Sequence, residues 1–322
     1  MGRVFCMRVL ITGGAGFIGS HFTRKLLEQG LAVDCLDNFN SYYDPMRKRG
    51  NIESFLQHPR YRLFEGDIVD AACLETLFQN NHYDIVVHLA ARAGVRPSIQ
   101  QPLLYEQVNV QGTLNLLEGC RRHDIRKMIF ASSSSVYGAN NKVPFSENDP
   151  VDHPISPYAA TKKAGELMCY TYHHLYGLSV SCMRFFTVYG PRQRPDMAIH
   201  KFARLIMEGK PLPVFGDGRS RRDYTYIDDI IQGLYAALLR CEGYHIYNLG
   251  ESSTVELSYL IALLEGALDK PAIVEYRPEQ PGDVPITCAD IQRARDELAY
   301  QPVTPIEQGI LAFTEWFKQT IS

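Results

Sequence analysis

The first half of the chain alternates short apolar segments with longer amphipathic ones. The short segments are rich in β-branched residues, so they predict strands at 8–12, 31–36, 61–66, 84–90, 127–134 and 178–186. The longer segments predict helices at 17–29, 70–80, 99–122 and 156–176. Because strands that alternate with helices form right-handed βαβ units, the pattern predicts an α/β fold with a doubly wound parallel sheet.

The pattern changes after residue 186, where proline, glycine and charge gather at 190–195, 210–218 and 279–283. We interpret this half as a smaller, discontinuous α/β lobe over the carboxyl ends of the strands, where such sheets bind ligands. Core-like segments at 226–239 and 244–250 indicate that the chain returns to the sheet. The expected boundaries are therefore 1–186 with 225–250 for the sheet domain, and 187–224 with 251–322 for the substrate-binding lobe.

Composition narrows the class of protein. With 322 residues and a net charge of −3, the chain can bury a large core and has no general attraction for nucleic acid or an anionic membrane. No apolar stretch approaches the roughly 18 residues that span a bilayer. The eight cysteines form no Cys-x-x-Cys pair, and His173 and His174 have no third ligand nearby in sequence. We therefore expect a reducing cytoplasm and no metal site.

A glycine-rich turn follows the first predicted strand. Gly13, Gly16 and Gly19 have the spacing G-x-x-G-x-x-G, which allows a tight turn, close approach to a pyrophosphate, and packing of helix on strand. The following helix N-terminus favours phosphate binding. Asp37 ends the second strand, where a carboxylate accepts hydrogen bonds from a ribose and repels a 2′-phosphate. The motif therefore predicts NAD rather than NADP.

A second motif opens the helix at 156–176. Tyr158 and Lys162 are four residues apart and share one helical face, and we expect the ammonium to lower the pKa of the tyrosine. Tyr158 then becomes a candidate general base or acid for a sugar hydroxyl. Ser133 and Ser135 lie at the end of a predicted strand and could share the proton.

Together these motifs resemble the extended short-chain dehydrogenase/reductases, and within them the nucleotide-sugar 4-epimerases. The resemblance continues through LDNFNSYYDP, HLAARAGVR, SSSSVYG, SPYAATKKAGE, MRFFTVYGPRQRPDMA, GDGRSRRDYTYIDDI and QPGDV, so it covers nearly the whole chain. It implies a Rossmann-type sheet and NAD contacts from Gly13, Gly16, Phe17, Ile18, Gly19, Asp37, Asn38, Asp67, Ile68, Leu89, Ala90, Ala91, Tyr158 and Lys162.

The same resemblance implies the substrate contacts. Tyr158 and Ser135 match the proton-transfer pair, with Ser133 beside them, while Arg222 matches a diphosphate contact and Phe215 a uracil contact. The full implied set is Arg96, Ser133, Ser134, Ser135, Thr187, Arg194, Phe215, Arg222, Gln280 and Asp283.

Two positions separate the subfamilies. Related 4,6-dehydratases carry Asp-Glu before V-Y-G, and decarboxylases usually carry an acidic residue there, whereas this chain has Ser134 and Ser135. UDP-galactose-type epimerases generally carry Asn where this chain has Thr187. The threonine followed by GPRQRPDMA resembles the UDP-glucuronate 4-epimerases.

The chemistry of glucuronate gives Thr187 a reason. Oxidation at C4 creates a ketone β to the C6 carboxylate, and β-keto acids lose carbon dioxide easily. An epimerase must therefore hold the carboxylate away from the alignment that favours decarboxylation. Our hypothesis assigns Thr187 to the carboxylate and Arg194 to a clamp on the sugar–phosphate end of the substrate.

The sequence thus predicts reversible, NAD-dependent 4-epimerisation of UDP-glucuronate to UDP-galacturonate through a transient 4-keto sugar. A UDP-glucose/galactose 4-epimerase, a UDP-glucuronate decarboxylase and a catalytically silent NAD-binding sensor or scaffold remain alternatives. The helices at 99–122 and 156–176 resemble those of a dimer interface in the superfamily, which implies a homodimer.

Overall fold

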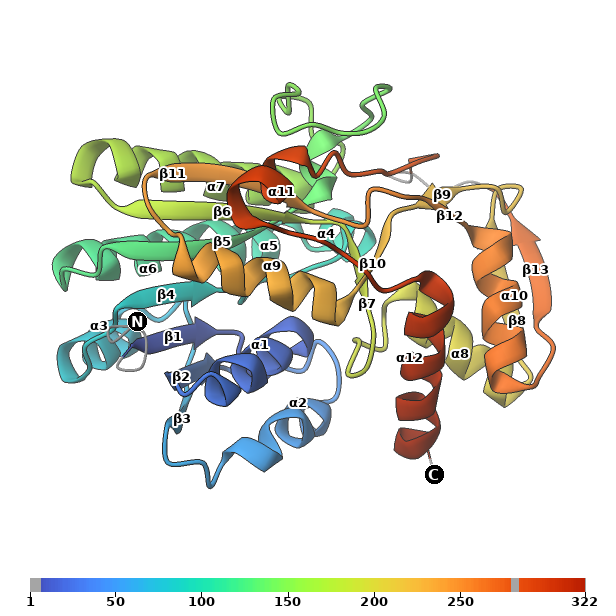
Figure 1. Ribbon diagram of the computed structural model, residues 1–322, viewed down its shortest axis with the longest axis horizontal. Coiled ribbons are helices and arrows are strands. Elements are labelled where there is room, and N and C mark those ends of the chain that lie inside the picture. Colours follow the sequence, from blue (N-terminus) through green and yellow to red (C-terminus); the bar gives the residue numbers. More distant parts are fainter. Residues whose placement is uncertain (1–6, 279–283, 322) are drawn as a thin grey trace.

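A seven-stranded parallel sheet forms the centre of the protein (Figure 1). This computed structural model describes residues 7–278 and 284–321. The strand order is β11-β6-β5-β4-β1-β2-β3, so the order reverses between β1 and β4, where such sheets bind ligands. The strands are β1 Arg8–Thr12, β2 Ala32–Asp37, β3 Tyr61–Glu65, β4 Ile85–His88, β5 Lys127–Ser133, β6 Ser179–Phe185 and β11 Tyr244–Leu249.

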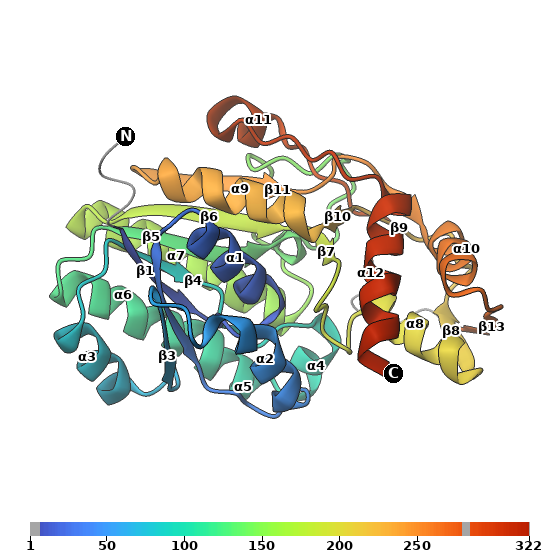
Figure 2. The same ribbon diagram turned by 60° about the horizontal axis from the view of Figure 1, so that its bottom comes forward.

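Helices cover both faces of the sheet (Figure 2). On one face lie α1 (Phe17–Glu28) and α9 (Ile227–Leu239), which pack against each other. On the other lie α3 (Ala71–Asn80), α6 (Gly112–Arg122) and α7 (Pro157–Tyr176). Because both faces are covered, successive strand residues such as Leu10 and Ile11 are equally buried, which explains the continuous apolar runs in the sequence.

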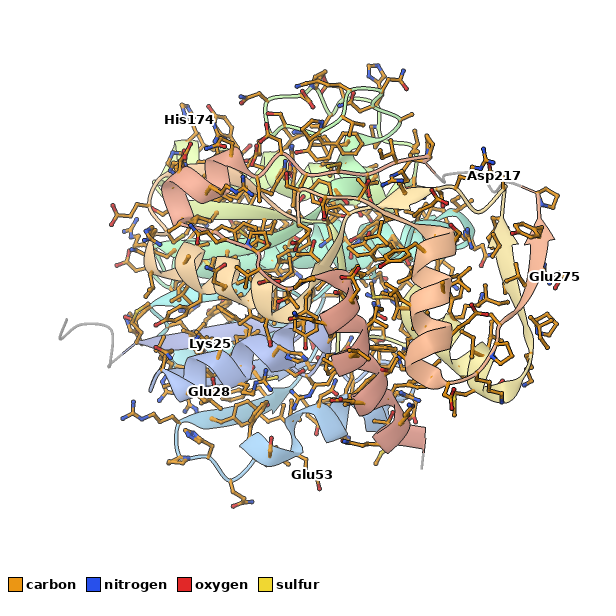
Figure 3. All side chains as sticks on the ribbon, turned by 45° about the vertical axis from the view of Figure 1, so that its right-hand side comes forward. Lys25, Glu28, Glu53, His174, Asp217 and Glu275 are labelled. Atoms are coloured by element: carbon orange, nitrogen blue, oxygen red, sulfur yellow. The ribbon has the colours of Figure 1, made fainter. Side chains whose placement is uncertain are left out.

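The second half of the chain builds a smaller lobe, at the right of Figure 1. Its helices are α8 (Ala198–Glu208), α10 (Leu257–Leu268) and α12 (Ile306–Ile321). Its strand pairs are β8 (Pro211–Phe215) with β13 (Ile273–Arg277), and β9 (Arg221–Arg222) with β12 (Val255–Glu256). Figure 3 shows Asp217 and Glu275 at the outer edge of this lobe, far from Lys25 and Glu28 on α1.

The chain passes between the two parts several times. β7 (Thr187–Tyr189) pairs in parallel with β10 (Tyr224–Tyr226) beside the sheet, and α9 and β11 then return to the sheet, where β11 pairs with β6. Later, α11 (Gln292–Leu298) packs against β11. We therefore propose the interleaved boundaries 1–186 with 225–250 and 187–224 with 251–322, with α11 lying on the sheet side.

The structure corrects the single helix expected at 99–122. The segment is instead α4 (Val95–Gln100), α5 (Pro102–Glu106), a π-helical turn (Gln107–Gln111) and then α6. The interruption lies at Gln101, with φ −131° and ψ 52°, because the ring of Pro102 disfavours a helical residue before it.

One helix had no apolar signature in the sequence. α2 (Pro45–Ile52) reads PMRKRGNI, and a short 3-10 turn (Glu53–Phe55) follows it. Asp44 begins α2 by accepting a hydrogen bond from the Met46 amide, and Pro45 occupies the first helical position. These local start signals, rather than a hydrophobic face, explain the helix.

Candidate functional site

A cavity of about 670 Å³ opens at the carboxyl ends of the central strands. Its volume lies within the roughly 300–1,000 Å³ that small-molecule sites occupy. The structure brings most of the predicted site residues into its wall, and they come from both expected sets. They are Gly13, Gly16, Phe17, Ile18, Gly19, Asp37, Asn38, Asp67, Ile68, Leu89, Ala90, Ala91, Ser133, Ser134, Ser135, Tyr158, Lys162, Thr187 and Arg194.

The glycine-rich turn between β1 and α1 leaves no room for side chains. Gly13 has a φ of +71°, and a Cβ there would lie 2.8 Å from the Ala90 nitrogen. A Cβ on Gly19 would lie 2.3 Å from the Gly13 carbonyl oxygen. Gly16 precedes the first turn of α1, whose amides face the cavity end of the helix. This backbone cradle fits a pyrophosphate.

Asp37, at the end of β2, is held from three directions. One carboxylate oxygen accepts a hydrogen bond from the Phe39 amide at 2.9 Å and from Lys48 Nζ at 3.0 Å. The other oxygen accepts from the Ala15 amide at 3.3 Å. The sequence analysis did not identify Lys48, because α2, which carries it, gave no hydrophobic signal. The arrangement fits the ribose-binding carboxylate that the sequence predicted.

A buried histidine supports the cradle from behind. His88 Nδ1 lies 2.8 Å from the Thr12 hydroxyl, and its Nε2 lies 3.0 Å from the Thr113 hydroxyl. Since Thr113 donates to the Asn109 carbonyl oxygen at 2.5 Å, its oxygen accepts from a protonated His88 Nε2. Burial lowers the pKa of His88 to about 3, so the imidazole is neutral at pH 7. His88 therefore ties β1 to β4 beneath the cofactor cradle.

Tyr158 and Lys162 occupy the start of α7, which Ser156 caps by accepting from the Ala159 amide at 3.1 Å. Lys162 Nζ donates to the Ala131 carbonyl oxygen at 2.6 Å, and burial lowers the pKa of this lysine to about 8. Burial raises the pKa of Tyr158, while a hydrogen bond with Ser133 and the Arg194 cation act in the opposite direction.

Two details of the predicted catalytic set need correction. The cation that opposes the raised pKa of Tyr158 is Arg194 rather than Lys162, because the lysine ammonium is engaged with the backbone of β5. The serine that hydrogen-bonds Tyr158 is Ser133 rather than Ser135. Ser133 also accepts from the Ser135 amide at 3.1 Å, which caps the 3-10 turn Ser134–Tyr137.

A buried ion pair holds α7 against the sheet behind these residues. Glu166 accepts from Arg184 through both carboxylate oxygens, at 2.8 and 2.9 Å, and both side chains are almost fully buried. Ser132 donates to Glu166 at 2.6 Å. Ser132 lies between Ala131, which binds Lys162, and Ser133, which binds Tyr158. The sequence analysis missed this network, whose members are distant in sequence.

The remaining wall carries the predicted substrate residues. Thr187 lies at the start of β7, and Arg194 follows it in the loop before α8. Arg194 donates to both oxygens of Asp196, at 3.0 and 2.8 Å, and lies 5.6 Å from the Tyr42 ring. Tyr42 in turn donates to the Ala93 carbonyl oxygen at 2.9 Å. Tyr42 and Asp196 belong to the SYYDP and RPDMA motifs, but the sequence gave neither a role.

Three predicted substrate residues do not line this cavity. The Arg96 guanidinium lies 4.5 Å from the centre of the Phe215 ring, and Arg222 donates to the Arg221 carbonyl oxygen at 3.0 Å. Phe215 and Arg222 lie on β8 and β9 of the lobe. Gln280 and Asp283 lie outside the described residues. The uracil and diphosphate contacts therefore stay predictions.

Neither metal binding nor membrane insertion finds support in the described part of the chain. Between residues 7–278 and 284–321, no group of three or more His, Cys, Asp or Glu side chains could hold a metal ion. Across these same ranges, no helix is long and apolar enough to cross a membrane. His174, marked in Figure 3, lies exposed near the end of α7, where it stacks on Tyr170.

Known proteins share this arrangement. The family described as NAD dependent epimerase/dehydratase matches residues 9–250. A UDP-glucuronate 4-epimerase from Thermodesulfobacterium geofontis is 44% identical over 313 residues, covering 97% of this chain and 96% of that protein.

Solved structures give the same picture. The crystal structure of UDP-glucuronic acid 4-epimerase from Bacillus cereus, in complex with UDP-glucuronic acid and NAD, has a TM-score of 0.92 and 38% identity, covering 98% of this chain and all of that one. A UDP-glucose 4-epimerase complex with NAD from Thermus thermophilus has a TM-score of 0.89 and 33% identity, covering 97% and 99% of the two chains.

Proposed function

The chain belongs to the NAD dependent epimerase/dehydratase family, and from that premise we propose that it interconverts UDP-glucuronate and UDP-galacturonate, with NAD as a bound cofactor. The observation that carries the proposal is a single cavity lined by the glycine cradle, the Tyr158–Ser133 hydroxyl pair and Thr187. The reaction has no net redox change, so the isomerase needs no second substrate.

The residues of the cavity divide the work. Gly13, Gly16 and Gly19 would hold the pyrophosphate of the cofactor, and Asp37 the adenosine ribose. When bound, NAD supplies the acceptor and donor of hydride at C4 of the sugar. Tyr158 takes the proton of the 4-hydroxyl group as C4 is oxidised, and returns it when the other epimer forms.

The hydroxyl groups beside Tyr158 complete the proton path. Ser133 already hydrogen-bonds Tyr158, so it can share the proton of the 4-hydroxyl group, and Ser135 lines the same cavity. Lys162 holds α7 against β5 through the Ala131 carbonyl oxygen. The keto sugar turns within the site between oxidation and reduction, so the wall around it must stay closed to water without binding either face tightly.

Retention of the carboxylate depends on the wall opposite the cofactor. We assign Thr187 to a hydrogen bond with the C6 carboxylate, and Arg194 to the sugar–phosphate end of the substrate. Arg194 is engaged with Asp196, so it would exchange part of that ion pair for the substrate. A hydrogen bond to a charged group contributes about 1.5–3 kcal/mol, enough to select the carboxylate orientation.

Proton NMR tests the proposal directly. Purified protein is incubated with UDP-glucuronate or UDP-glucose, without added NAD, and the anomeric signals are followed. We expect UDP-galacturonate from the first substrate and much slower conversion of the second. Faster conversion of UDP-glucose would favour a UDP-glucose 4-epimerase, and a UDP-keto-pentose would indicate a decarboxylase. No conversion of either sugar, with NAD bound, would indicate a sensor or scaffold.

We further propose that the protein is a homodimer. Apolar side chains are exposed along neighbouring helices α4, α5 and α7, and they are Ile99, Leu103, Leu167, Tyr170 and Leu175. Leu103 alone is 83% exposed. Contiguous exposed apolar surface is typical of protein interfaces.

Sedimentation velocity tests the dimer. The wild-type chain should sediment as a dimer, and Leu103→Asp should shift it towards a monomer. Leu311→Asp, at a comparably exposed leucine on α12, is the matched control and should leave the dimer intact. A monomeric wild-type chain would contradict the proposal.

For location we propose the reducing cytoplasm. The described cysteines, Cys35, Cys73, Cys120, Cys169, Cys182, Cys241 and Cys288, are all free thiols. Disulfides are rare in reducing compartments, so free buried thiols suit the cytoplasm.

A further inference from the structure

A lysine is buried beside the ribose-binding carboxylate. The side chain of Lys48 is 10% exposed, that of Asp37 is 2% exposed, and Lys48 Nζ lies 3.0 Å from an Asp37 oxygen. The ammonium also lies 5.6 Å from the centre of the Tyr43 ring. Lysine is almost never buried unless its charge is paired, so the position of Lys48 requires an explanation.

The surroundings of Lys48 place it at the cofactor site rather than in the core alone. Lys48 and Asp37 both line the large cavity, together with Tyr43. Arg49, the next residue, faces elsewhere: its guanidinium makes a bidentate pair with Glu65 at 2.9 Å and stacks on Phe39. Of these two neighbouring cations on α2, only Lys48 therefore contacts Asp37 and lines the cavity.

The pair combines two opposite recognition chemistries. A carboxylate at the end of the second strand accepts hydrogen bonds from ribose hydroxyls, whereas a cation at this place accommodates the 2′-phosphate of NADP. Here the carboxylate stands in front and uses the cation as its own partner. Asp37 therefore decides the outcome as long as it is present, since an unshielded carboxylate would face any phosphate.

We propose that Lys48 is a second determinant of cofactor choice: it orients Asp37 for the ribose of NAD, and it is a latent 2′-phosphate site that Asp37 keeps occupied. The proposal rests on the proposed function, since it assumes that the cavity takes an adenine dinucleotide. It extends that function by naming which residue, besides Asp37, sets the choice between NAD and NADP.

A competition for binding tests the proposal without using activity. Purified protein is exchanged in an equimolar mixture of NAD⁺ and NADP⁺, free nucleotide is removed by gel filtration, and acid-released nucleotide is measured by chromatography. The variants are Lys48→Gln, Arg49→Gln, Asp37→Ser, Asp37→Ser with Lys48→Gln, and Asp37→Ser with Arg49→Gln. Thermal melting of each variant checks that it is folded.

The wild-type protein should retain NAD⁺ in large excess, and Lys48→Gln should lower retained NAD⁺ while Arg49→Gln does not. Asp37→Ser should raise the ratio of bound NADP⁺ to NAD⁺ by about tenfold or more, the value of one charge-assisted hydrogen bond. Adding Lys48→Gln should remove that gain, and adding Arg49→Gln should preserve it. Should Asp37→Ser not fold, Asp37→Asn gives the same comparison with the shape of the side chain kept.

The proposal is wrong if the ratio rises equally with and without Lys48, or if it does not rise when Asp37 is replaced. Such a result, obtained while the wild-type protein binds NAD⁺, would leave the proposed function untouched. A wild-type protein that retains neither dinucleotide would instead contradict the proposed function itself.

Discussion

The two ends of the large cavity are built differently. At the cofactor end, the Gly13 turn and Asp37 come from β1, β2 and the helix between them, and their polar groups are partnered by neighbouring backbone. At the sugar end, Tyr158, Thr187 and Arg194 come from α7, β7 and a following loop. There the polar groups are partnered mainly by other side chains, as Arg194 is by Asp196.

This difference matches what each end must hold. The cofactor end binds the same rigid group throughout the reaction, so backbone packing can determine its shape. The sugar end must hold a ring that turns over between two hydride transfers, so its contacts must exchange partners. Side-chain contacts such as the Arg194–Asp196 pair can exchange, whereas the cradle at Gly13 and Gly19 cannot without moving the main chain.

The sharpest separation of the two ends is expected from Tyr158→Phe. Loss of the phenol oxygen removes the proton acceptor, so turnover of UDP-glucuronate should fall by about 10²–10⁴-fold. The amount of NAD released by acid should stay unchanged, because the cradle is not touched. Tyr176→Phe, at an exposed tyrosine at the end of α7, should keep full turnover. Normal turnover by Tyr158→Phe would contradict the assignment.

The converse variant damages the cofactor end. A Cβ on residue 19 would meet the Gly13 carbonyl oxygen at 2.3 Å, so Gly19→Ala must displace the turn. Overpacking of this kind costs about 1–3 kcal/mol, which predicts roughly tenfold or greater loss of bound NAD. Gly266→Ala is the matched control, since a Cβ there meets nothing within 4 Å. Unchanged NAD content in Gly19→Ala, measured by acid release, would show that the cradle is more adaptable than described.

Specificity at the sugar end is tested by Thr187→Val, which keeps the shape of the side chain and removes its hydroxyl group. The preference in kcat/KM for UDP-glucuronate over UDP-glucose should fall about tenfold, the value of one hydrogen bond to a charge. A UDP-keto-pentose should appear among the products in NMR spectra. Thr171→Val, at an exposed position of α7, serves as the control. The assignment of Thr187 is wrong if both preference and products are unchanged.

The smallest effect concerns the support of the cofactor end by His88. Its pKa is about 3 in the folded protein and 6.5 in the reference state, so below pH 6.5 the unfolded chain takes up a proton that the folded chain does not. Stability from the neutral imidazole is therefore present above pH 6.5 and is lost as the pH falls towards 3. The loss is about 1.4 kcal/mol per pH unit.

Urea unfolding at pH 7 and pH 5.5 measures this loss. His88→Gln should lose about 1 kcal/mol less between the two pH values than the wild-type protein does. Part of the acid sensitivity should remain in the variant, because burial also lowers the pKa of His21 to about 3. Equal losses in both proteins would contradict a neutral, supporting His88.

The contrast between the two ends also explains what the sequence could predict. The cofactor end is local: a glycine turn and the carboxylate of the next strand are close in sequence, and both lie where the pattern placed them. The strands of the sheet were equally readable, because burial on both faces makes each one continuously apolar. The helix expected at 99–122 failed for a local reason too, since the effect of Pro102 on Gln101 was not considered.

The remaining features depend on contacts between distant segments. Lys48 meets Asp37 only because α2 folds over the end of β2, and Arg194 meets Tyr158 only because the loop before α8 returns to α7. Neither pairing has a spacing that a sequence pattern could reveal. The stacking of Arg96 on Phe215, outside the main cavity, is of the same kind.

The most direct test of the central claim follows the hydrogen on C4. UDP-[4-²H]glucuronate is incubated with purified protein, without added NAD, and the product is examined by NMR and mass spectrometry. The account predicts UDP-galacturonate that retains its deuterium at C4, because the hydride leaves and returns within one closed site. Loss of the deuterium to solvent, or a pentose product in place of UDP-galacturonate, would contradict it.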